Sequence, residues 1–227
     1  MSFRAFRRGL ITTLLLLTPS GVASADGLSE VSELLRTDAQ AQSALSICPV
    51  AAGEEARVTK NKVSNDTTVC SGEPHACLLD CRAGDPDRCF QLALVLEGKK
   101  GQIDDAIVGA QSLYALGCRT GDAASCTNRA AGIMHHRLGI PTSMSERIDI
   151  DQADWSTCLL RTFSATCAVD NVWGCTMKGL MLSNDALAGT HPVKAIAAFD
   201  RACELAPRSQ PCQMGDSIRE AAGMPPR

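Results

Sequence analysis

The sequence predicts an all-α protein, a right-handed solenoid of antiparallel helix pairs whose turns are clamped by disulfides. Cysteine pairs recur with seven or eight residues between them, as in the stretch CRTGDAASC. The first cysteines of successive pairs are 37, 49 and 36 residues apart, and a period in the mid-thirties is typical of helix-turn-helix repeats. Only six aromatic residues follow residue 25, so alanine and leucine must form most of the core. The four pairs are Cys81 and Cys89, Cys118 and Cys126, Cys167 and Cys175, and Cys203 and Cys212.

Residues 1–25 have the features of a secretory signal peptide. Arg4, Arg7 and Arg8 form a basic start, the apolar run GLITTLLLLT follows, and the letters ASA precede an expected cleavage after Ala25. The apolar run is about half of the ~20 residues that a membrane-spanning helix needs, and no later run matches it. We therefore expect an exported protein, periplasmic or secreted, without a membrane span.

The charge balance argues against nucleic acid as a partner. The whole chain has a formal net charge of −3, and loss of the three arginines of residues 1–25 changes this charge to −6. Lysine and arginine form no cluster beyond the letters KNK and KKG, whereas a nucleic-acid-binding protein presents a basic stripe. We expect neither a nucleic-acid partner nor binding to an anionic membrane surface.

The cysteine content indicates disulfides rather than a metal site. All twelve cysteines follow residue 25, and an even number in an exported chain is typical of disulfides formed in an oxidising compartment. Structural zinc sites favour Cys-x-x-Cys or Cys/His pairs, and the chain contains no Cys-x-x-Cys. We expect six disulfides, no metal and no cofactor.

Residues 26–68 are predicted to form an N-terminal capping helix, or a helix pair, and a connector. The stretch LSEVSELLRTDAQAQSALSIC has apolar residues near helical spacing. A polar connector is expected from Ala51 to Thr68. The apolar residues of the capping segment are Leu28, Val31, Leu34, Leu35 and Leu45.

Residues 69–222 form the predicted solenoid. In each unit, helix A follows the second cysteine of a pair, and helix B ends at the first cysteine of the next pair. In the first full unit, helix A covers about Pro86–Glu97 and helix B about Asp104–Gly117. Four residues before the leading cysteine, helix B carries an aromatic side chain that we expect to point inward, because positions four apart share a helical face. These aromatic residues are Tyr114, Phe163 and Phe199.

Helix A carries a small residue four positions after the second cysteine, where it lets two helices approach closely. These residues are Ala93, Ala130 and Gly179. The matched positions on both sides of the 49-residue spacing place an insertion at about residues 137–151, RLGIPTSMSERIDID.

The turn between units carries a residue that tolerates the left-handed conformation, followed by a helix N-cap. Asp and Asn replace Gly and Asp in the third turn, and they tolerate the same two tasks. A disulfide across so short a loop stabilises the fold by about 2.5 kcal/mol in the chain-entropy model. The residue pairs are Gly84 and Asp85, Gly121 and Asp122, and Asp170 and Asn171.

Four further cysteines, Cys48, Cys70, Cys77 and Cys158, allow three connectivities. Cys70 and Cys77 are close in sequence around a stretch similar to a shortened turn, which favours that pair and leaves Cys48 with Cys158. In the alternative, Cys77 points inward, because it stands four residues before Cys81, and meets the N-terminal segment.

The pattern C-x-x-G-D-x-x-x-C, followed by K-A-x-x-x-F-x-x-A-C, resembles the Sel-one-like repeats in their secreted, cysteine-rich bacterial branch, with a TPR-like fold. The resemblance covers about residues 70–215. It departs where the usual leucine, present as Leu92, is replaced by Arg129 and Lys178. The second pattern is carried by Lys194, Ala195, Phe199, Ala202 and Cys203.

The resemblance also raises an enzymatic alternative, a penicillin-binding protein with weak β-lactamase activity. A serine β-lactamase uses Ser-x-x-Lys and Lys-Thr-Gly elements, and neither occurs in the chain. His135 and His136 are expected to be a surface pair beside the insertion, and His75 and His191 are expected to be structural. We therefore favour a protein without enzymatic activity.

The favoured function is a scaffold that binds a protein or peptide outside the cytoplasm in the concave groove lined by the A helices. A structural or host-facing exported protein without a small-molecule ligand is a third possibility. Trp173 lies within a clamp turn, where it either packs on the neighbouring unit or marks a contact site. The other candidate contacts are residues that break the apolar pattern of the A helices. For each of them, the alternative is a solvated position on the helix surface. These residues are Arg88, Gln91, Asn128, Arg129 and Lys178.

Overall fold

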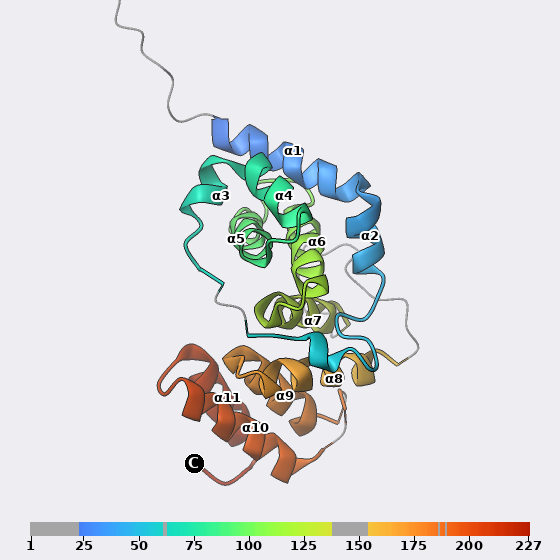
Figure 1. Cartoon of the computed structure of the whole chain (residues 1–227). Helices are drawn as coiled ribbons and strands as arrows, with labels where there is room; N and C mark the ends of the chain where they lie inside the picture. The colour runs from blue at the N-terminus through green and yellow to red at the C-terminus, as the bar shows by residue number, and fades with distance from the viewer. Residues whose placement is uncertain (1–22, 61–62, 138–153, 186, 189) are drawn as a thin grey trace, which may run out of the picture.

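The computed structural model describes residues 23–60, 63–137, 154–185, 187–188 and 190–227 (Figure 1). Within these ranges the chain is all-helical, with no named strand. The helices of the N-terminal part are α1 (Ala23–Thr37), α2 (Ala39–Leu45), the short 3-10 helix η1 (Glu55–Arg57), α3 (Thr68–Gly72) and α4 (Pro74–Arg82). The remaining helices are α5 (Pro86–Glu97), α6 (Ala106–Arg119), α7 (Ala123–Arg137), α8 (Trp155–Ala168), α9 (Val172–Ser183), α10 (Pro192–Leu205) and α11 (Gln210–Ala221).

Two sequence predictions fall mainly on residues that the structure does not describe. The predicted signal peptide lies outside the described residues up to residue 22, and α1 begins at Ala23. The predicted insertion begins at Arg137, the last residue of α7, and the rest of it lies outside the described residues. None of the helices described is both long enough and apolar enough to cross a bilayer.

The helices alternate as the repeat predicts. α5, α7, α9 and α11 follow the second cysteines as A helices, and each contacts the next A helix along the chain. α6, α8 and α10 end near the first cysteines as B helices, and each packs against the A helices before and after it. The described part of the chain therefore has a repeat-like, all-helical architecture (Figure 1).

The bounds of the first unit agree with the prediction for helix A and differ by two residues for helix B. α5 covers Pro86–Glu97 as expected. α6 begins at Ala106 because Asp105 adopts a left-handed conformation with φ of 55°, which a right-handed helix excludes. Helix α6 continues past Gly117 and ends at Arg119. The residue with the left-handed conformation that ends the helix is Gly121, not Gly117.

All four turns place a left-handed residue directly before an N-cap. Three of these pairs are the predicted ones, with φ of 101°, 94° and 63° at their first residues, and their second residues accept backbone hydrogen bonds from the following helix. In the fourth turn Arg208 has φ of 61°, and the Ser209 hydroxyl accepts from the Cys212 backbone N–H at 3.4 Å. The predicted turn chemistry is therefore confirmed, and it extends to a turn without glycine or aspartate.

All twelve cysteines are joined in six disulfides, and none is free. Four of these disulfides, which we call the short clamps, join cysteines that are eight or nine positions apart in the sequence. The favoured pairing of the other four cysteines is also found: Cys70 with Cys77, and Cys48 with Cys158. These bonds fit an extracellular or otherwise oxidising environment.

The aromatic residues of the B helices are buried, as predicted. Tyr114 and Phe163 are fully buried, and Phe199 is 1% exposed. Helices α9 and α10 approach closely, since a Cβ on Gly179 would lie 2.3 Å from Phe199 Cε1. A glycine is therefore required at this position for the two helices to pack.

The N-terminal segment covers the first unit. α1 and α2 both pack against α6, and α1 also packs against α4. Leu28, Val31 and Leu35 are buried, whereas Leu34 is 42% exposed because it lies about 100° around the helix from Leu35. Helix α6 is thereby enclosed from several sides, and this explains why it is buried from Ala106 to Cys118.

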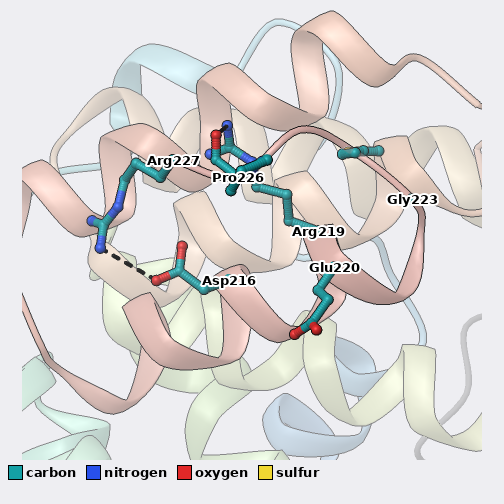
Figure 2. A pocket seen from close by; sticks show the side chains of 7 residues that line it. Asp216, Arg219, Glu220, Gly223, Pro226 and Arg227 are labelled. Atoms are coloured by element: carbon teal, nitrogen blue, oxygen red, sulfur yellow. Dashed lines mark hydrogen bonds and ion pairs between the residues drawn. The ribbon is translucent and has the colours of Figure 1, made fainter.

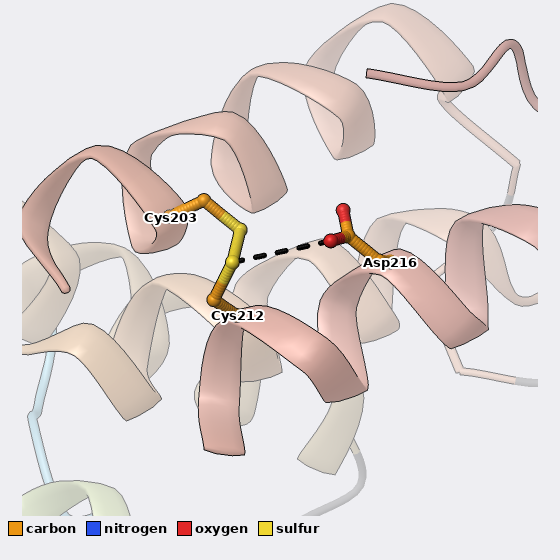
Figure 3. A group of neighbouring side chains, drawn as sticks. All are labelled: Cys203, Cys212 and Asp216. Carbon is orange, nitrogen blue, oxygen red and sulfur yellow. Dashed lines mark hydrogen bonds between the residues drawn. A yellow bond between two sulfur atoms is a disulfide. The ribbon is translucent and has the colours of Figure 1, made fainter. Parts of the chain in front are cut away.

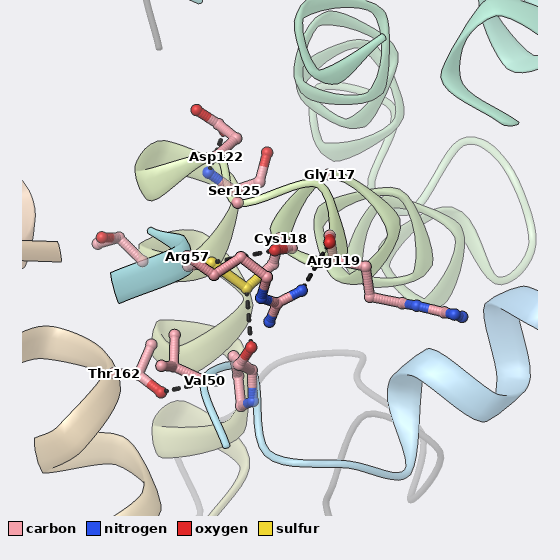
Figure 4. The surroundings of a disulfide bond; sticks show 12 residues. Val50, Arg57, Gly117, Cys118, Arg119, Asp122, Ser125 and Thr162 are labelled. Atoms are coloured by element: carbon pink, nitrogen blue, oxygen red, sulfur yellow. Dashed lines mark hydrogen bonds between the residues drawn. A yellow bond between two sulfur atoms is a disulfide. The ribbon is translucent and has the colours of Figure 1, made fainter. Parts of the chain in front are cut away.

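Val58 of the predicted polar connector Ala51–Thr68, and Val50 just before it, are buried, whereas the other described residues of the connector are exposed or half-buried, as expected of a polar connector. Val50 and Val58 are 0% and 3% exposed, in a cluster that includes the Cys118 and Cys126 clamp and Ala165 of α8. The Val50 N–H donates to the Thr162 hydroxyl at 3.3 Å (Figure 4). The connector therefore fills the space between the α6–α7 turn and α8.

The backbone of the connector also pairs with that turn. The Thr59 N–H donates to the Gly121 carbonyl at 2.8 Å, and the Ala123 N–H donates to the Thr59 carbonyl at 3.2 Å. Arg57 Nη1 donates to the Arg119 carbonyl at 2.6 Å (Figure 4). These bonds satisfy the carbonyl of Arg119 at the end of α6, the carbonyl of Gly121 in the turn and the N–H of Ala123 at the start of α7.

Replacement of Cys48 and Cys158 together by alanine is expected to lower the free energy of unfolding by about 4 to 5 kcal/mol, because this bond closes a long loop. The same replacement of Cys118 and Cys126 should cost about 2.5 kcal/mol. Urea unfolding of the oxidised variants measures both values. A larger loss from the short clamp than from the Cys48–Cys158 bond would contradict the prediction.

Asp122 generates a pH-dependent prediction. It is fully buried, it accepts from the Ser125 backbone N–H at 2.7 Å, and burial raises its pKa (Figure 4). Since the pKa is higher in the folded than in the unfolded state, the stabilising contribution of Asp122 is present below the unfolded pKa and is lost as the pH rises through the folded pKa. Asp122→Asn keeps an N-cap side chain that does not titrate. The free energy of unfolding of this variant, relative to that of the parent, should therefore rise from pH 4 to pH 7.

The matched variant is Asp122→Ala, which also lacks the titrating carboxyl but loses the cap, so it should be about 1 kcal/mol less stable than Asp122→Asn at either pH. Urea unfolding at both pH values compares the three proteins. An asparagine variant as unstable as the alanine variant at pH 7 would refute this account of Asp122.

Candidate functional site

One position of the repeat lines a shared cavity. The second residue after the second cysteine of a pair is Asn128 in α7, Met177 in α9 and Met214 in α11, and all three line one cavity of about 310 Å³. Side chains from four A helices and from α6 surround it. We name it the groove cavity, and its lining residues are Glu97, Gln111, Thr127, Asn128, Ala131, Gly132, His135, Trp173, Met177 and Met214.

Two of the six residues predicted as groove contacts lie in this cavity. Asn128 is half-buried in α7, and Trp173 is half-buried in the first turn of α9. Trp173 lines the cavity, which agrees with the interpretation of this residue as a candidate contact. These two residues are the part of the predicted contact set that the structure brings together.

Arg129 is not a groove contact, which corrects its prediction. Its side chain is fully buried: Nη2 donates to the Leu45 carbonyl at 2.7 Å and Nη1 donates to Gln111 Oε1 at 3.2 Å. The reason is helical geometry, because the third residue after the cysteine lies about 100° around the helix from the second. Arg129 thus links α7 to the end of α2 and to α6.

Lys178, at the same repeat position as Arg129, lies away from the groove cavity. It lines a separate hollow with Lys194 and with Arg201, whose guanidinium pairs with Asp170 at 2.6 Å. This hollow lies among α8, α9 and α10. The structure therefore separates Lys178 from Asn128 and Trp173.

Arg88 and Gln91 also lie outside the groove cavity, near the start of α5. Gln91 is 4% exposed, which corrects its prediction as a surface contact, and its Nε2 donates to Asp87 Oδ2 at 2.8 Å. Arg88 Nη1 donates to Gln91 Oε1 at 2.9 Å. Arg88 and Gln91 therefore bond to each other, and Gln91 Oε1 also lies 3.6 Å from the Cys70 sulfur.

Glu97, the last residue of α5, brings a carboxylate to the groove cavity. The buried Tyr114 hydroxyl donates to its Oε2 at 2.9 Å. Burial raises the pKa of Glu97, and the bond from Tyr114 opposes that rise. Burial and the nearby carboxylate also raise the pKa of Tyr114 well above its ordinary value. The hydroxyl of Tyr114 therefore stays a donor.

His135 lines the groove cavity, although the sequence led us to expect a surface residue. It is half-buried in the last turn of α7, and burial lowers its pKa. Three positions earlier, a Cβ on Gly132 would lie 2.2 Å from Gln111 Oε1. The absence of a side chain at Gly132 allows the Gln111 amide to reach the cavity from α6.

The sequence prediction therefore missed eight of the ten lining residues, namely Glu97, Gln111, Thr127, Ala131, Gly132, His135, Met177 and Met214. A signal for the two methionines was present, because they occupy the repeat position of Asn128. Glu97 and Gln111 carry no such signal, since each depends on a contact with another helix.

A second hollow lies at the C-terminal end of the chain (Figure 2). The Arg219 side chain is 7% exposed there, and its Nη1 pairs with Asp200 at 2.6 Å. Its Nε and Nη2 donate to the carbonyls of Pro225 and Pro226. Arg227 pairs with Asp216 across the rim at 3.3 Å (Figure 2). These bonds hold the C-terminal residues against α11.

One group of potential metal ligands occurs in the described part of the chain. The ligand atoms of Cys203, Cys212 and Asp216 lie within 4.8 Å of one another (Figure 3). The two sulfurs are joined as a disulfide, whereas a cysteine binds a metal as its thiolate. The group therefore does not fit a metal ion in the oxidised protein.

No protein-family model, no curated protein and no solved structure matches the chain.

The environment of His135 leads to a measurable expectation. Because burial lowers its pKa, the imidazole should titrate below pH 6.5 and be neutral at pH 7. NMR titration of the histidine ring protons, assigned with a His135→Gln variant, measures the value. A pKa above 6.5 would contradict the lowered value.

Proposed function

We propose that the protein is an exported, disulfide-clamped solenoid of Sel-one-like helix pairs that binds an extended peptide segment of another protein. The single observation that carries the proposal is the groove cavity, to which all four A helices contribute side chains. A cavity shared by successive units follows the line of the stack, which suits an extended ligand.

The chemistry of the lining supports a peptide ligand. Trp173, Met177 and Met214 offer a large apolar surface, and methionine adapts to differently shaped partners. Asn128 and Gln111 add amide groups, which can donate and accept hydrogen bonds with a peptide backbone. At about 310 Å³, the cavity has room for an anchoring side chain.

The disulfides support a function outside the cytoplasm. The six bonds require an oxidising compartment to form and persist. They also hold the A helices in fixed positions, so the groove loses little conformational entropy when a peptide binds.

Penicillin binding with weak β-lactamase activity remains the enzymatic alternative, and its support is the family resemblance. The ten lining residues of the groove cavity include neither serine nor lysine, which are the nucleophile and the basic partner of a serine β-lactamase. Peptide binding is therefore the better supported function. Hydrolysis of a chromogenic β-lactam by the oxidised protein would favour the alternative.

Selection of a phage-displayed peptide library on the oxidised protein tests the proposal. Selected peptides are synthesised, and their affinities are measured by fluorescence anisotropy. Trp173→Ala and Asn128→Ala should each weaken binding about tenfold, because truncation of a central anchor typically costs more than 1 kcal/mol.

Lys178→Ala is the matched control, since Lys178 is also in α9 but lines another hollow. Its affinity for the selected peptides should equal that of the parent. If no peptide is selected, or if the peptides bind the Trp173 and Asn128 variants as tightly as the parent, the groove cavity is not the binding site.

A further inference from the structure

We propose that the groove cavity receives a basic side chain, lysine or arginine, of the bound peptide, with its charged end on the Glu97 carboxylate. The proposal rests on peptide binding in the groove and names the anchor of that peptide. It is carried by the charges of the lining, by the position of Glu97 at the end of α5 and by the apolar residues that also line the cavity.

The ionisable residues of the lining are Glu97 and His135. His135 is half-buried, and burial disfavours its charged form. No lysine or arginine lines the cavity. The lining thus contains one carboxylate and no lysine or arginine, which favours a cationic ligand over an anionic one.

The Glu97 carboxylate has no cationic partner among the described residues. The Tyr114 hydroxyl donates to Oε2 at 2.9 Å, and no salt bridge to Glu97 occurs in the described part of the chain. Glu97 as a whole residue is exposed, so a ligand can reach it, although its carboxylate lies close enough to other groups for burial to raise its pKa. It is also the last residue of α5, where the helix dipole favours a cation.

The rest of the lining fits the aliphatic part of the same side chain. Lysine and arginine carry three or four methylene groups that pack on apolar surface while the charged end meets a polar group. Trp173, Met177, Met214 and Ala131 provide that surface. An indole ring is also the aromatic group that attracts a cation most strongly.

The other two kinds of anchor fit less well. An apolar side chain would cover the carboxylate and remove water from it without providing a partner, which is costly. An acidic side chain would place a second negative charge beside Glu97. A basic side chain alone satisfies both the apolar wall and the carboxylate.

The experiment uses the peptides selected on the oxidised protein. Each basic residue of a selected peptide is replaced in turn by norleucine, which keeps an aliphatic chain and lacks the charge. For the parent protein, one such replacement should weaken binding about tenfold, as expected for a charge-assisted hydrogen bond. For Glu97→Gln, the same replacement should change the affinity less than about twofold, because the partner charge is absent.

Two controls accompany these measurements. The amide oxygen introduced by Glu97→Gln can still accept from the Tyr114 hydroxyl, and a thermal unfolding midpoint close to that of the parent confirms that the variant folds. Glu220→Gln removes the same charge from α11 at the C-terminal hollow, and it should leave the loss caused by norleucine unchanged.

The outcomes separate the two proposals. Selected peptides without a basic residue, or an equal effect of norleucine on the parent and on Glu97→Gln, would overturn the basic anchor. If Trp173→Ala still weakens binding in that case, the groove function stands. A failure to select any peptide overturns both proposals.

Discussion

The architecture depends on a single constraint, the disulfide that joins the end of each B helix to the start of the next A helix. The bond crosses a turn in which a left-handed residue directly precedes an N-cap. A disulfide anchored within the first helical turn fixes the rotation of the A helix about its axis. The second residue after the clamp consequently faces the groove cavity in three helices, as Asn128, Met177 and Met214 do.

The segment after α2 connects the α6–α7 turn to α8. Val50 and Val58 fill the space between the α6–α7 turn and α8, and the Cys48–Cys158 bond joins that segment to α8. Arg129 reaches the same segment from α7 through the Leu45 carbonyl. A buried arginine is tolerated there because protein acceptors replace the water that it loses.

The sequence predicted those features that depend on neighbours along the chain. The bounds of α5, the N-caps at Asp85 and Asn171 and the short clamps all follow from residues less than ten positions apart. The failures come from distant contacts: the fate of Arg129 depends on a carbonyl 84 positions away, and the role of Glu97 depends on a hydroxyl from the next helix. Periodicity does not encode such contacts.

The aromatic residues of the B helices connect the core to the groove. Phe163 and Phe199 end in apolar rings, whereas Tyr114 at the same repeat position carries a hydroxyl. This hydroxyl crosses from α6 to α5 and bonds to Glu97 at the edge of the cavity. Because Tyr114 is fully buried in a close-packed core, its hydroxyl is a well-placed donor for this carboxylate. Tyr114, which differs from Phe163 and Phe199 at the same repeat position, thus provides a hydrogen bond to Glu97, the one acidic residue that lines the cavity.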